Sequence, residues 1–320
     1  MADKNNIFAA AIVGPTGVGK TKTSVLLAKK INAQIVSADS MQIYKNMDIG
    51  TAKASGEEMC GIKHYMLSVA EPYEEYNVVR YAAEAKAAVE KIAADGFFPL
   101  IVGGTGLYAD SLLNGTDFSK TVSDEEYRAK LAETAKEKGN EYLHAVLEKI
   151  DRESAEKIHC NNVKRVIRAL EIYHVTGKTK TENDIAANEN ASGIDCVKIG
   201  LYLETELLYE RINARVDDML EKGLVGEVEK ILKSEKGFSK TSSQAIGYRE
   251  IIDYLNGKTT YDEAKELLKR NSRRYAKRQY TWFMRDKSIH WIDAKAYDCE
   301  KAALKCEEII INAKKERNIL

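Results

Sequence analysis

The chain has 320 residues, enough for one large core and a second lobe. Apolar residues make up 44% and charged residues 31%, with three prolines, which is typical of a helix-rich globular protein and excludes a fibrous or disordered chain. Lysine plus arginine number 49, and so do aspartate plus glutamate, so net charge alone gives no argument for a nucleic-acid partner. The five cysteines are scattered without metal-site spacing, so we expect reduced structural thiols.

Residues 1–118 alternate strand and helix patterns. Apolar runs predict strands at Phe8–Val13, Gln34–Ala38 and Phe98–Val102, and amphipathic patterns predict helices at Lys20–Ile31 and Asn77–Ala94. This order predicts an α/β fold, a P-loop type parallel sheet flanked by helices on both faces. The opening apolar run is too short to span a bilayer, so we expect a cytosolic protein that makes no membrane contact. We also expect a monomer.

Residues 119–195 change to charged sequence with helical periodicity and no convincing strand, so we predict an inserted all-helical lobe. Residues 196–320 then return to the core as its second part. The predicted elements of the lobe are helices at Asp124–Lys138, Glu141–Ile150 and Val163–His174. Those of the second core part are strands at Val197–Leu203 and Ile289–Ile292, helices near Glu204–Lys222, Ala245–Tyr254 and Tyr261–Phe283, and a solvated tail helix from Glu300.

Residues 14–21 fit the phosphate-binding pattern G-x-x-x-x-G-K-[ST], between a predicted strand and a predicted helix. Backbone N–H groups and the helix N-terminus would surround a phosphate, Lys20 would neutralise its outer oxygens, and Thr21 can hold Mg²⁺. The alternative is a glycine-rich turn without a ligand, but both flanks have the structure that phosphate binding requires. The expected diphosphate contacts are Gly14, Pro15, Thr16, Gly17, Val18, Gly19, Lys20 and Thr21.

The bound phosphate compound is a separate question, because the loop recognises a diphosphate more than the group attached to it. An ATPase would usually place an aspartate after an apolar strand to hold Mg²⁺. Here the strand Phe98–Val102 is followed by Gly103, Gly104 and Thr105. This ending suits a hydroxyl and a closely packed backbone rather than a metal carboxylate.

Asp39 directly follows a predicted strand, so we expect it at the carboxyl edge of the sheet, facing the phosphate loop. There a carboxylate could accept the proton that an amine loses when it is alkylated. The alternative is that Asp39 only caps a turn or holds Mg²⁺ through water. Ser40, Gln42 and Tyr44 come next and offer groups that could bind the edges of a base.

Taken together, these segments closely resemble tRNA dimethylallyltransferases. A chance P-loop protein would not carry all the matches, which run in family order across nearly the whole chain. They are Gly14-Pro15-Thr16, Asp39-Ser40-Met41-Gln42-Ile43-Tyr44, Met47-Asp48-Ile49-Gly50-Thr51-Ala52-Lys53, Val102-Gly103-Gly104-Thr105-Gly106-Leu107-Tyr108, Arg168-Ala169-Leu170-Glu171, Ile246-Gly247-Tyr248-Arg249-Glu250, and Ala276-Lys277-Arg278-Gln279 with Thr281-Trp282-Phe283. The departures are Ala54, Tyr65 and Ser68, none of which is a proposed catalytic group.

The resemblance implies that dimethylallyl diphosphate occupies the phosphate loop with Mg²⁺, and that the adenosine next to the anticodon of tRNA (position 37) is flipped into the same site. By that similarity Asp39 is the base for the N6 amine, Gln42 helps to recognise the adenine, and Thr105 hydrogen-bonds near the reacting centre. Lys20 and either Arg211 or Arg215 would stabilise the departing diphosphate, and Arg215 fits the family pattern better.

Basic residues at helical spacing, with aromatic residues between them, could contact tRNA phosphates along 269–285. The alternative there is a solvated basic face with its aromatics in the core. Trp282 is expected to pack rather than to stack on a base. The residues expected at the tRNA are Asp39, Ser40, Met41, Gln42, Thr105, Arg128, Lys164, Arg165, Arg168, Tyr248, Arg249, Arg274, Lys277 and Arg278.

Three other functions remain open. An adenylate isopentenyltransferase would use a free nucleotide, and the helical lobe and basic segment would then be surplus. In a P-loop nucleotide kinase, Asp39 would position a phosphate acceptor. A non-catalytic RNA-binding module would not need the intact Lys20, Thr21 and Asp39.

Overall fold

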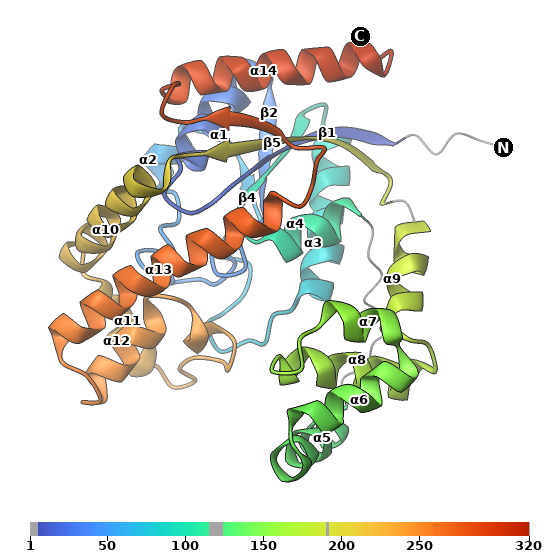
Figure 1. The fold of residues 1–320 in the computed structure, drawn as a ribbon. Coiled ribbons are helices and arrows are strands. Elements are labelled where there is room, and N and C mark those ends of the chain that lie inside the picture. The colour runs from blue at the N-terminus through green and yellow to red at the C-terminus, as the bar shows by residue number, and fades with distance from the viewer. Residues whose placement is uncertain (1–5, 115–123, 190–191, 320) are drawn as a thin grey trace. The chain divides into compact units, whose positions relative to one another are not determined.

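The computed structural model describes residues 6–114, 124–189 and 192–319. Within them one parallel six-stranded sheet has the order β3-β2-β4-β1-β5-β6 (Figure 1). The strands are β1 (Ile7–Val13), β2 (Ala33–Ser37), β3 (His64–Tyr65), β4 (Phe98–Gly103), β5 (Ile194–Tyr202) and β6 (His290–Asp293). The predicted α/β sheet is confirmed. Only β3 was not predicted, because two residues are too short to show an alternating pattern.

Helices cover both faces of the sheet because both faces are apolar. In β1, Ala9 and Ala11 enter one core while Ala10 and Ile12 enter the other, as the alternation of a strand requires. The helices of this unit are α1 (Lys20–Lys30), α2 (Gly56–Met59), α3 (Val78–Ala94), α4 (Gly106–Leu113), α10 (Thr205–Glu221), α11 (Leu224–Leu232), α12 (Tyr248–Leu255), α13 (Tyr261–Phe283) and α14 (Cys299–Glu316). The turn of 3-10 helix Ser242–Gln244 delays the start of α12 relative to the prediction.

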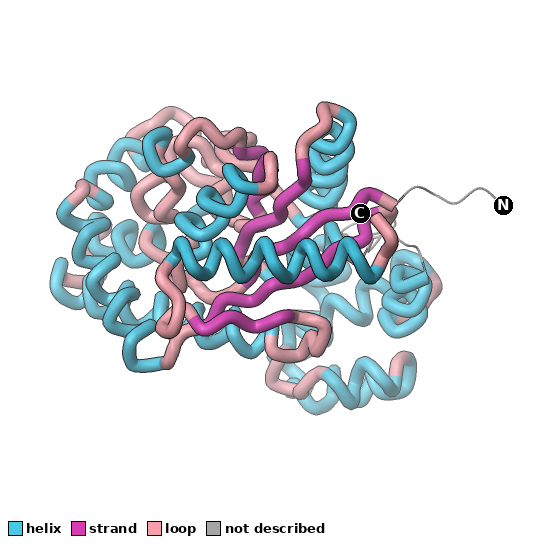
Figure 2. The backbone as a smooth tube through the Cα atoms, turned by 90° about the horizontal axis from the view of Figure 1, so that it is seen from above, coloured by secondary structure: helices cyan, strands magenta, loops and turns pink. Residues whose placement is uncertain are grey.

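The prediction of a solvated tail helix is wrong. Helix α14 lies over the strands (Figure 2) and packs against α1. Its buried face is built mostly from small side chains, so the many lysines and glutamates around it obscured the apolar stripe. The residues of that face are Ala302, Ala303, Cys306, Ile310 and Ala313.

The chain divides into two compact units, Met1–Leu113 with Gly193–Leu320, and Asn114–Ser192. The second unit has its own core around Leu143, Leu147 and Leu170, and its described residues form helices without a strand. Its helices are α5 (Glu125–Lys138), α6 (Asn140–Ile150), α7 (Arg152–Lys157), α8 (Val163–Thr176) and α9 (Lys180–Glu189). The boundary expected after residue 118 lies outside the described residues, and β5 begins two residues before the boundary expected at residue 196.

Candidate active site

The loops after β1, β2 and β4 meet at one edge of the sheet because these strands are parallel neighbours. The Ala38 N–H donates to Val102 O (2.8 Å), and the Thr105 N–H donates to Ala38 O (3.1 Å). A Cβ on Gly103 would lie 2.1 Å from Ala38 O, so this close approach requires glycine. The sheet order therefore places the phosphate loop, Asp39 and Thr105 together.

The phosphate loop has the conformation that its pattern requires. Gly14 has φ +143°, and a Cβ there would lie 2.4 Å from Leu201 O. On the other side Gly17 packs against Ile212 of α10. Helix α1 begins at Lys20 without an acidic residue in its first turn, so its N-terminus is available to an anion.

Two partly buried cations converge on this loop. Lys20 Nζ donates to Gly14 O (2.9 Å) and Pro15 O (2.8 Å), and Arg215 Nη1 donates to Thr16 Oγ1 (3.1 Å). Burial lowers the pKa of Lys20 to about 7, although the Asp39 charge opposes the shift. Burial also lowers the pKa of Arg215, again opposed by Asp39. Within the described chain neither cation forms an ion pair with a carboxylate, so the pair is suited to an anionic ligand.

Only one of the two candidate arginines on α10 reaches the loop. Arg215 also donates through Nη2 to Ala52 O (3.4 Å). Arg211, one turn earlier, is exposed and makes no hydrogen bond with any described residue. The structure thus brings Arg215, and not Arg211, to the phosphate loop.

Asp39 comes just after β2 and therefore lies at the same edge of the sheet as the phosphate loop after β1, since these strands are parallel. Its charge opposes the lowering of the pKa of both loop cations. Its Oδ1 accepts the N–H groups of Met41 (2.9 Å) and Gln42 (3.3 Å). Asp39 therefore does cap a turn. Its Oδ2 accepts no hydrogen bond from the described residues, which leaves one carboxylate oxygen available for a proton.

Thr105 is hydrogen-bonded to Ser40, the residue that follows Asp39. Its Oγ1 accepts the N–H of Ser40 (3.1 Å) and lies 3.4 Å from Tyr275 Oη. Burial raises the pKa of Tyr275 to about 12, so this hydroxyl stays protonated. The sequence interpretation missed Tyr275 as a site residue, because α13 follows Thr105 by more than a hundred residues.

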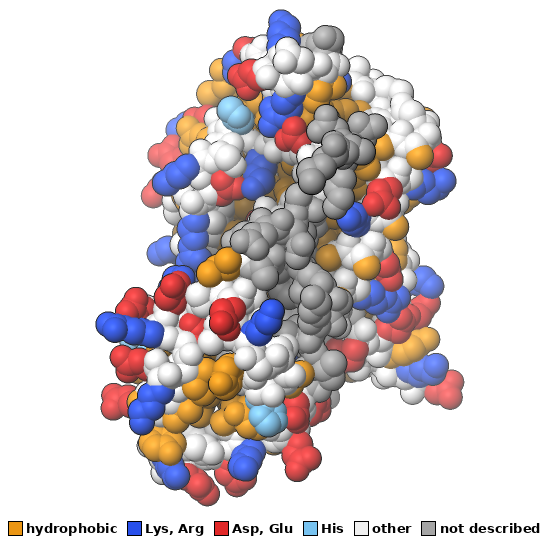
Figure 3. Space-filling model, turned by 90° about the vertical axis from the view of Figure 1, so that its right-hand side faces the viewer, with side chains coloured by type: hydrophobic (Ala, Val, Ile, Leu, Met, Phe, Trp, Pro, Cys, Tyr) orange, Lys and Arg blue, Asp and Glu red, His pale blue; other side chains and the backbone are white. Residues whose placement is uncertain are grey.

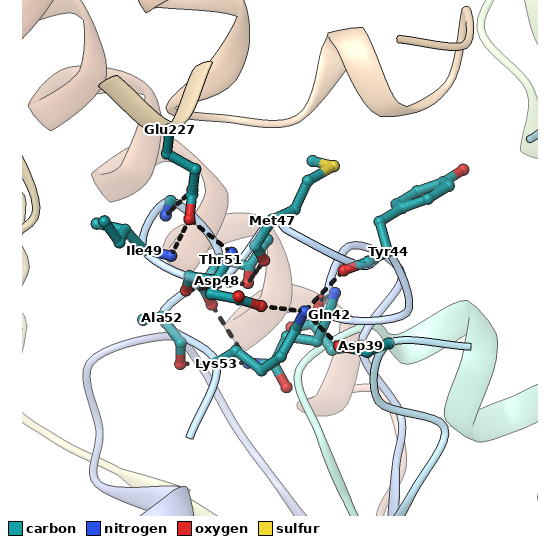
Figure 4. A network of polar contacts seen from close by, with 12 residues as sticks. Asp39, Gln42, Tyr44, Met47, Asp48, Ile49, Thr51, Ala52, Lys53 and Glu227 are labelled. Carbon is teal, nitrogen blue, oxygen red and sulfur yellow. Dashed lines mark hydrogen bonds and ion pairs between the residues drawn. The ribbon is translucent and has the colours of Figure 1, made fainter. Parts of the chain in front are cut away.

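The side chain of Gln42, labelled in Figure 4, is held by two backbone carbonyls and one serine hydroxyl. Its Nε2 donates to Thr51 O (3.2 Å) and Ala52 O (3.5 Å), and its Oε1 accepts from Ser37 Oγ (3.3 Å). Because Ala52 O also accepts from Arg215, the same loop holds the expected adenine-recognising amide and the expected diphosphate-binding arginine.

Glu227 of α11 holds that loop from its other side (Figure 4). Its carboxylate accepts the N–H groups of Asp48 (2.9 Å), Ile49 (2.8 Å) and Gly50 (3.1 Å). It also accepts the hydroxyl of Tyr248 (2.5 Å), which is fully buried. Tyr248 therefore has no surface to offer a tRNA, contrary to the prediction. No local motif around Glu227 could have indicated its role.

The predicted cationic residues differ in what they contact. On α13, Arg274, Lys277 and Arg278 are exposed. Arg249 is bound to Glu250 (2.6 Å). On the face of the molecule drawn in Figure 3, lysine and arginine side chains are interspersed with aspartate and glutamate, which agrees with the zero net charge.

In the helical unit, Lys164 and Arg165 are exposed at the start of α8. Arg128 and Arg168 instead bind the buried carboxylate of Glu171, at 2.7 and 2.5 Å. The sequence did not distinguish these two free cations from the two paired ones, because all four have the residue types and spacings of a basic surface.

A phosphate loop at a helix N-terminus, two partly buried cations and a carboxylate at one edge of a parallel sheet define a P-loop protein built to act on a phosphorylated substrate. The model of the family described as IPP transferase matches residues 42–286, and the chain belongs to this family. The resemblance drawn from the motifs is thereby confirmed.

Similar proteins cover nearly all of the chain. The tRNA dimethylallyltransferase of Acetivibrio thermocellus is 49% identical over 294 residues, which is 92% of this chain and 94% of that protein. The crystal structure of the tRNA isopentenylpyrophosphate transferase of Bacillus halodurans is 42% identical, with TM-score 0.73 and 98% coverage of both chains. A eukaryotic dimethylallyltransferase acting on tRNA is 31% identical, with TM-score 0.79, covering 98% of this chain and 80% of that one.

Proposed function

We propose that this protein transfers a dimethylallyl group from dimethylallyl diphosphate to the N6 amine of the adenosine next to the anticodon of tRNA. The observation that carries the proposal is the meeting of Asp39 with the phosphate loop at one sheet edge, in a chain of the IPP transferase family. One group can accept a proton there while the other holds a leaving diphosphate.

In the proposed reaction, the N6 nitrogen forms a bond to C1 of the dimethylallyl group as the bond from C1 to the diphosphate oxygen breaks. The N6 proton passes to Oδ2 of Asp39, the oxygen that the turn does not use. Negative charge grows on the diphosphate, where the loop N–H groups, Lys20 and Arg215 stabilise it. Diphosphate and the prenylated adenosine are the products.

Mg²⁺ would be held at this site mainly by the diphosphate of the substrate and only to a small extent by the protein. The hydroxyl of Thr21 is exposed at the start of α1. The described residues contain no cluster of three or more acidic, histidine or cysteine side chains that could hold a metal. Mg²⁺ commonly keeps several waters and binds substrate phosphates with few protein ligands, so Thr21 would suffice as a protein ligand. When bound, the ion would neutralise diphosphate charge.

We assign adenine recognition to the residues around Asp39. Ser40, Met41, Gln42 and Thr105 are all partly exposed there. A base must leave its stack for its amine to reach Asp39, and extrusion of this kind costs a few kcal/mol. Contacts from these side chains would offset that cost.

We assign tRNA phosphate contacts to exposed cations in both units, since backbone contacts supply much of the affinity for nucleic acids. In the first unit these are Arg274, Lys277 and Arg278, and in the helical unit Lys164 and Arg165. Arg128, Arg168 and Arg249 would contribute while paired to their glutamates. Within the described residues, no helix is apolar and long enough to cross a membrane.

The test is a transfer assay with labelled dimethylallyl diphosphate, Mg²⁺ and unmodified tRNA, alongside reactions containing AMP or ATP instead of tRNA. Label is expected in tRNA alone. Label in AMP would replace the proposal by an adenylate isopentenyltransferase, and phosphate transfer from ATP without prenylation would replace it by a kinase.

A further inference from the structure

Gln279 is a buried polar residue of α13 that bridges the two loops of the site. Its side chain is enclosed, with 5% of the residue exposed. Oε1 accepts the N–H of Thr16 in the phosphate loop (2.9 Å), and Nε2 donates to the carbonyl of Gly104 (2.9 Å). A buried amide satisfied on both ends rigidifies what it contacts.

Both partners are adjacent to groups of the proposed reaction. The hydroxyl of Thr16 accepts from Arg215, and Gly104 directly precedes Thr105. The fit is close, because a Cβ on Gly104 would lie 2.2 Å from Nε2 of Gln279. One turn earlier on the same helix, the Tyr275 hydroxyl lies 3.4 Å from Thr105 Oγ1. Helix α13 thus holds the loop after β1 and the loop after β4 together.

The same helix carries the exposed cations Arg274, Lys277 and Arg278. In the proposed function these side chains meet tRNA phosphates. A shift or ordering of α13 by tRNA would therefore reach the diphosphate site through Gln279, by a route separate from the contact between the reacting atoms.

We propose that Gln279 is a positioning residue that couples tRNA binding to diphosphate binding. The inference rests on the proposed function. A carboxamide both accepts and donates, so neither a carboxylate nor a thioether can make both contacts. Because coupling is reciprocal, each ligand raises the affinity of the other by the same factor.

The experiment measures the Kd of inorganic pyrophosphate with Mg²⁺, in the presence and absence of saturating unmodified tRNA. For the unaltered protein, tRNA is expected to tighten pyrophosphate binding by about fivefold or more. Gln279→Glu can still accept the Thr16 N–H but places a carboxylate against the Gly104 carbonyl. The factor by which tRNA tightens pyrophosphate binding should therefore fall toward one. Gln279→Met keeps the volume without a buried charge and should do the same. Glu266→Gln, at an exposed position of α13, is the control and should keep the full factor.

Thermal unfolding of each variant separates lost coupling from lost folding. The proposal is overturned if the unaltered protein shows no coupling, or if a folded Gln279→Met variant keeps it. Failure of the proposed function looks different, since the unaltered protein would then place no label in tRNA. If label transfer is intact while Gln279→Met keeps the coupling, only the inference about Gln279 fails.

Discussion

The two units of the molecule use cations in opposite ways. At the phosphate loop, Lys20 and Arg215 are partly buried and make no ion pair with a described residue. In the helical unit, Arg128 and Arg168 are partly exposed and both bind Glu171, whose side chain is 0% exposed.

The difference separates a cation kept for a ligand from a cation kept for the fold. A partly buried charge without an ionic partner costs free energy, and such an arrangement is typical of a functional site. In the helical unit the buried charge is instead a carboxylate, that of Glu171, and two arginines pair with it. The residue type alone is therefore a weak guide to function.

Replacing Asp39 gives the largest expected effect. Asp39→Asn keeps Oδ1 for the turn but removes the proton acceptor, so the rate of prenyl transfer should fall by about 10² to 10⁴. Pyrophosphate affinity should change little, which calorimetry can check. Asp262→Asn, at an exposed position of α13, is the matched control. Loss of pyrophosphate binding without a rate effect on bound substrate would indicate a metal-binding role instead.

Glu171→Gln tests the structural side of the comparison. Removing one partner of a buried ion pair can cost 3–5 kcal/mol, but both arginines can reach water, so we expect a loss of about 1–3 kcal/mol in the free energy of unfolding of the helical unit. Denaturant unfolding measures this loss, with the exposed Glu133→Gln as control. Pyrophosphate affinity should be unchanged; a parallel loss there would erase the distinction between the two units.

The same carboxylate predicts a pH dependence of stability. Burial acts to raise the pKa of Glu171, but Arg168, the Asp124 N–H and Arg128 together hold it below its ordinary value. A carboxyl whose folded pKa is depressed stabilises above its unfolded pKa and loses this contribution as pH falls through the folded value. The unfolding free energy should thus decline as the pH falls below the ordinary range of a glutamate carboxyl, and less so in Glu171→Gln.

Diphosphate binding should depend on pH through Lys20. In the protein without a ligand, the Lys20 amine has a pKa of about 7, so it is charged below that pH and increasingly neutral above it. An anion favours the charged form, so binding must take up a proton above pH 7, and affinity should fall by up to about tenfold per pH unit. Calorimetry with pyrophosphate measures this slope. Lys20→Arg cannot titrate in this range, so an equal slope in that variant would rule out Lys20 as its source.

The smallest effect is expected for the exposed cations of α13. Lys277→Ala should weaken tRNA binding severalfold and reduce the slope of log affinity against log salt by about 1, as loss of one phosphate contact requires. Filter binding over a salt series measures both. Lys30→Ala, at the exposed end of α1, should leave the slope unchanged. Equal effects of the two variants would indicate non-specific attraction only.

Much of the fold could be predicted because its signals are local. The alternation of β1, the helix after Lys20 and the glycines of residues 14–19 are all contained in a few neighbouring residues. Helix α13 begins and ends where its pattern predicts, at Tyr261 and Phe283. Helix α14 was misjudged because its buried face consists largely of alanine, which is common on both exposed and buried faces of helices.

By itself the sequence determined the phosphate loop, the carboxylate after the second strand and the family, since each depends on residue types at short spacings. Only the tertiary structure decided between Arg211 and Arg215 and showed that Tyr248 is buried. It also revealed that Gln279 and Glu227 hydrogen-bond to loops that are distant in the sequence. These contacts depend on β4 lying between β1 and β2, and on α13 packing beside that edge. Such pairings are set by the burial of apolar faces over the whole chain, which no short segment encodes.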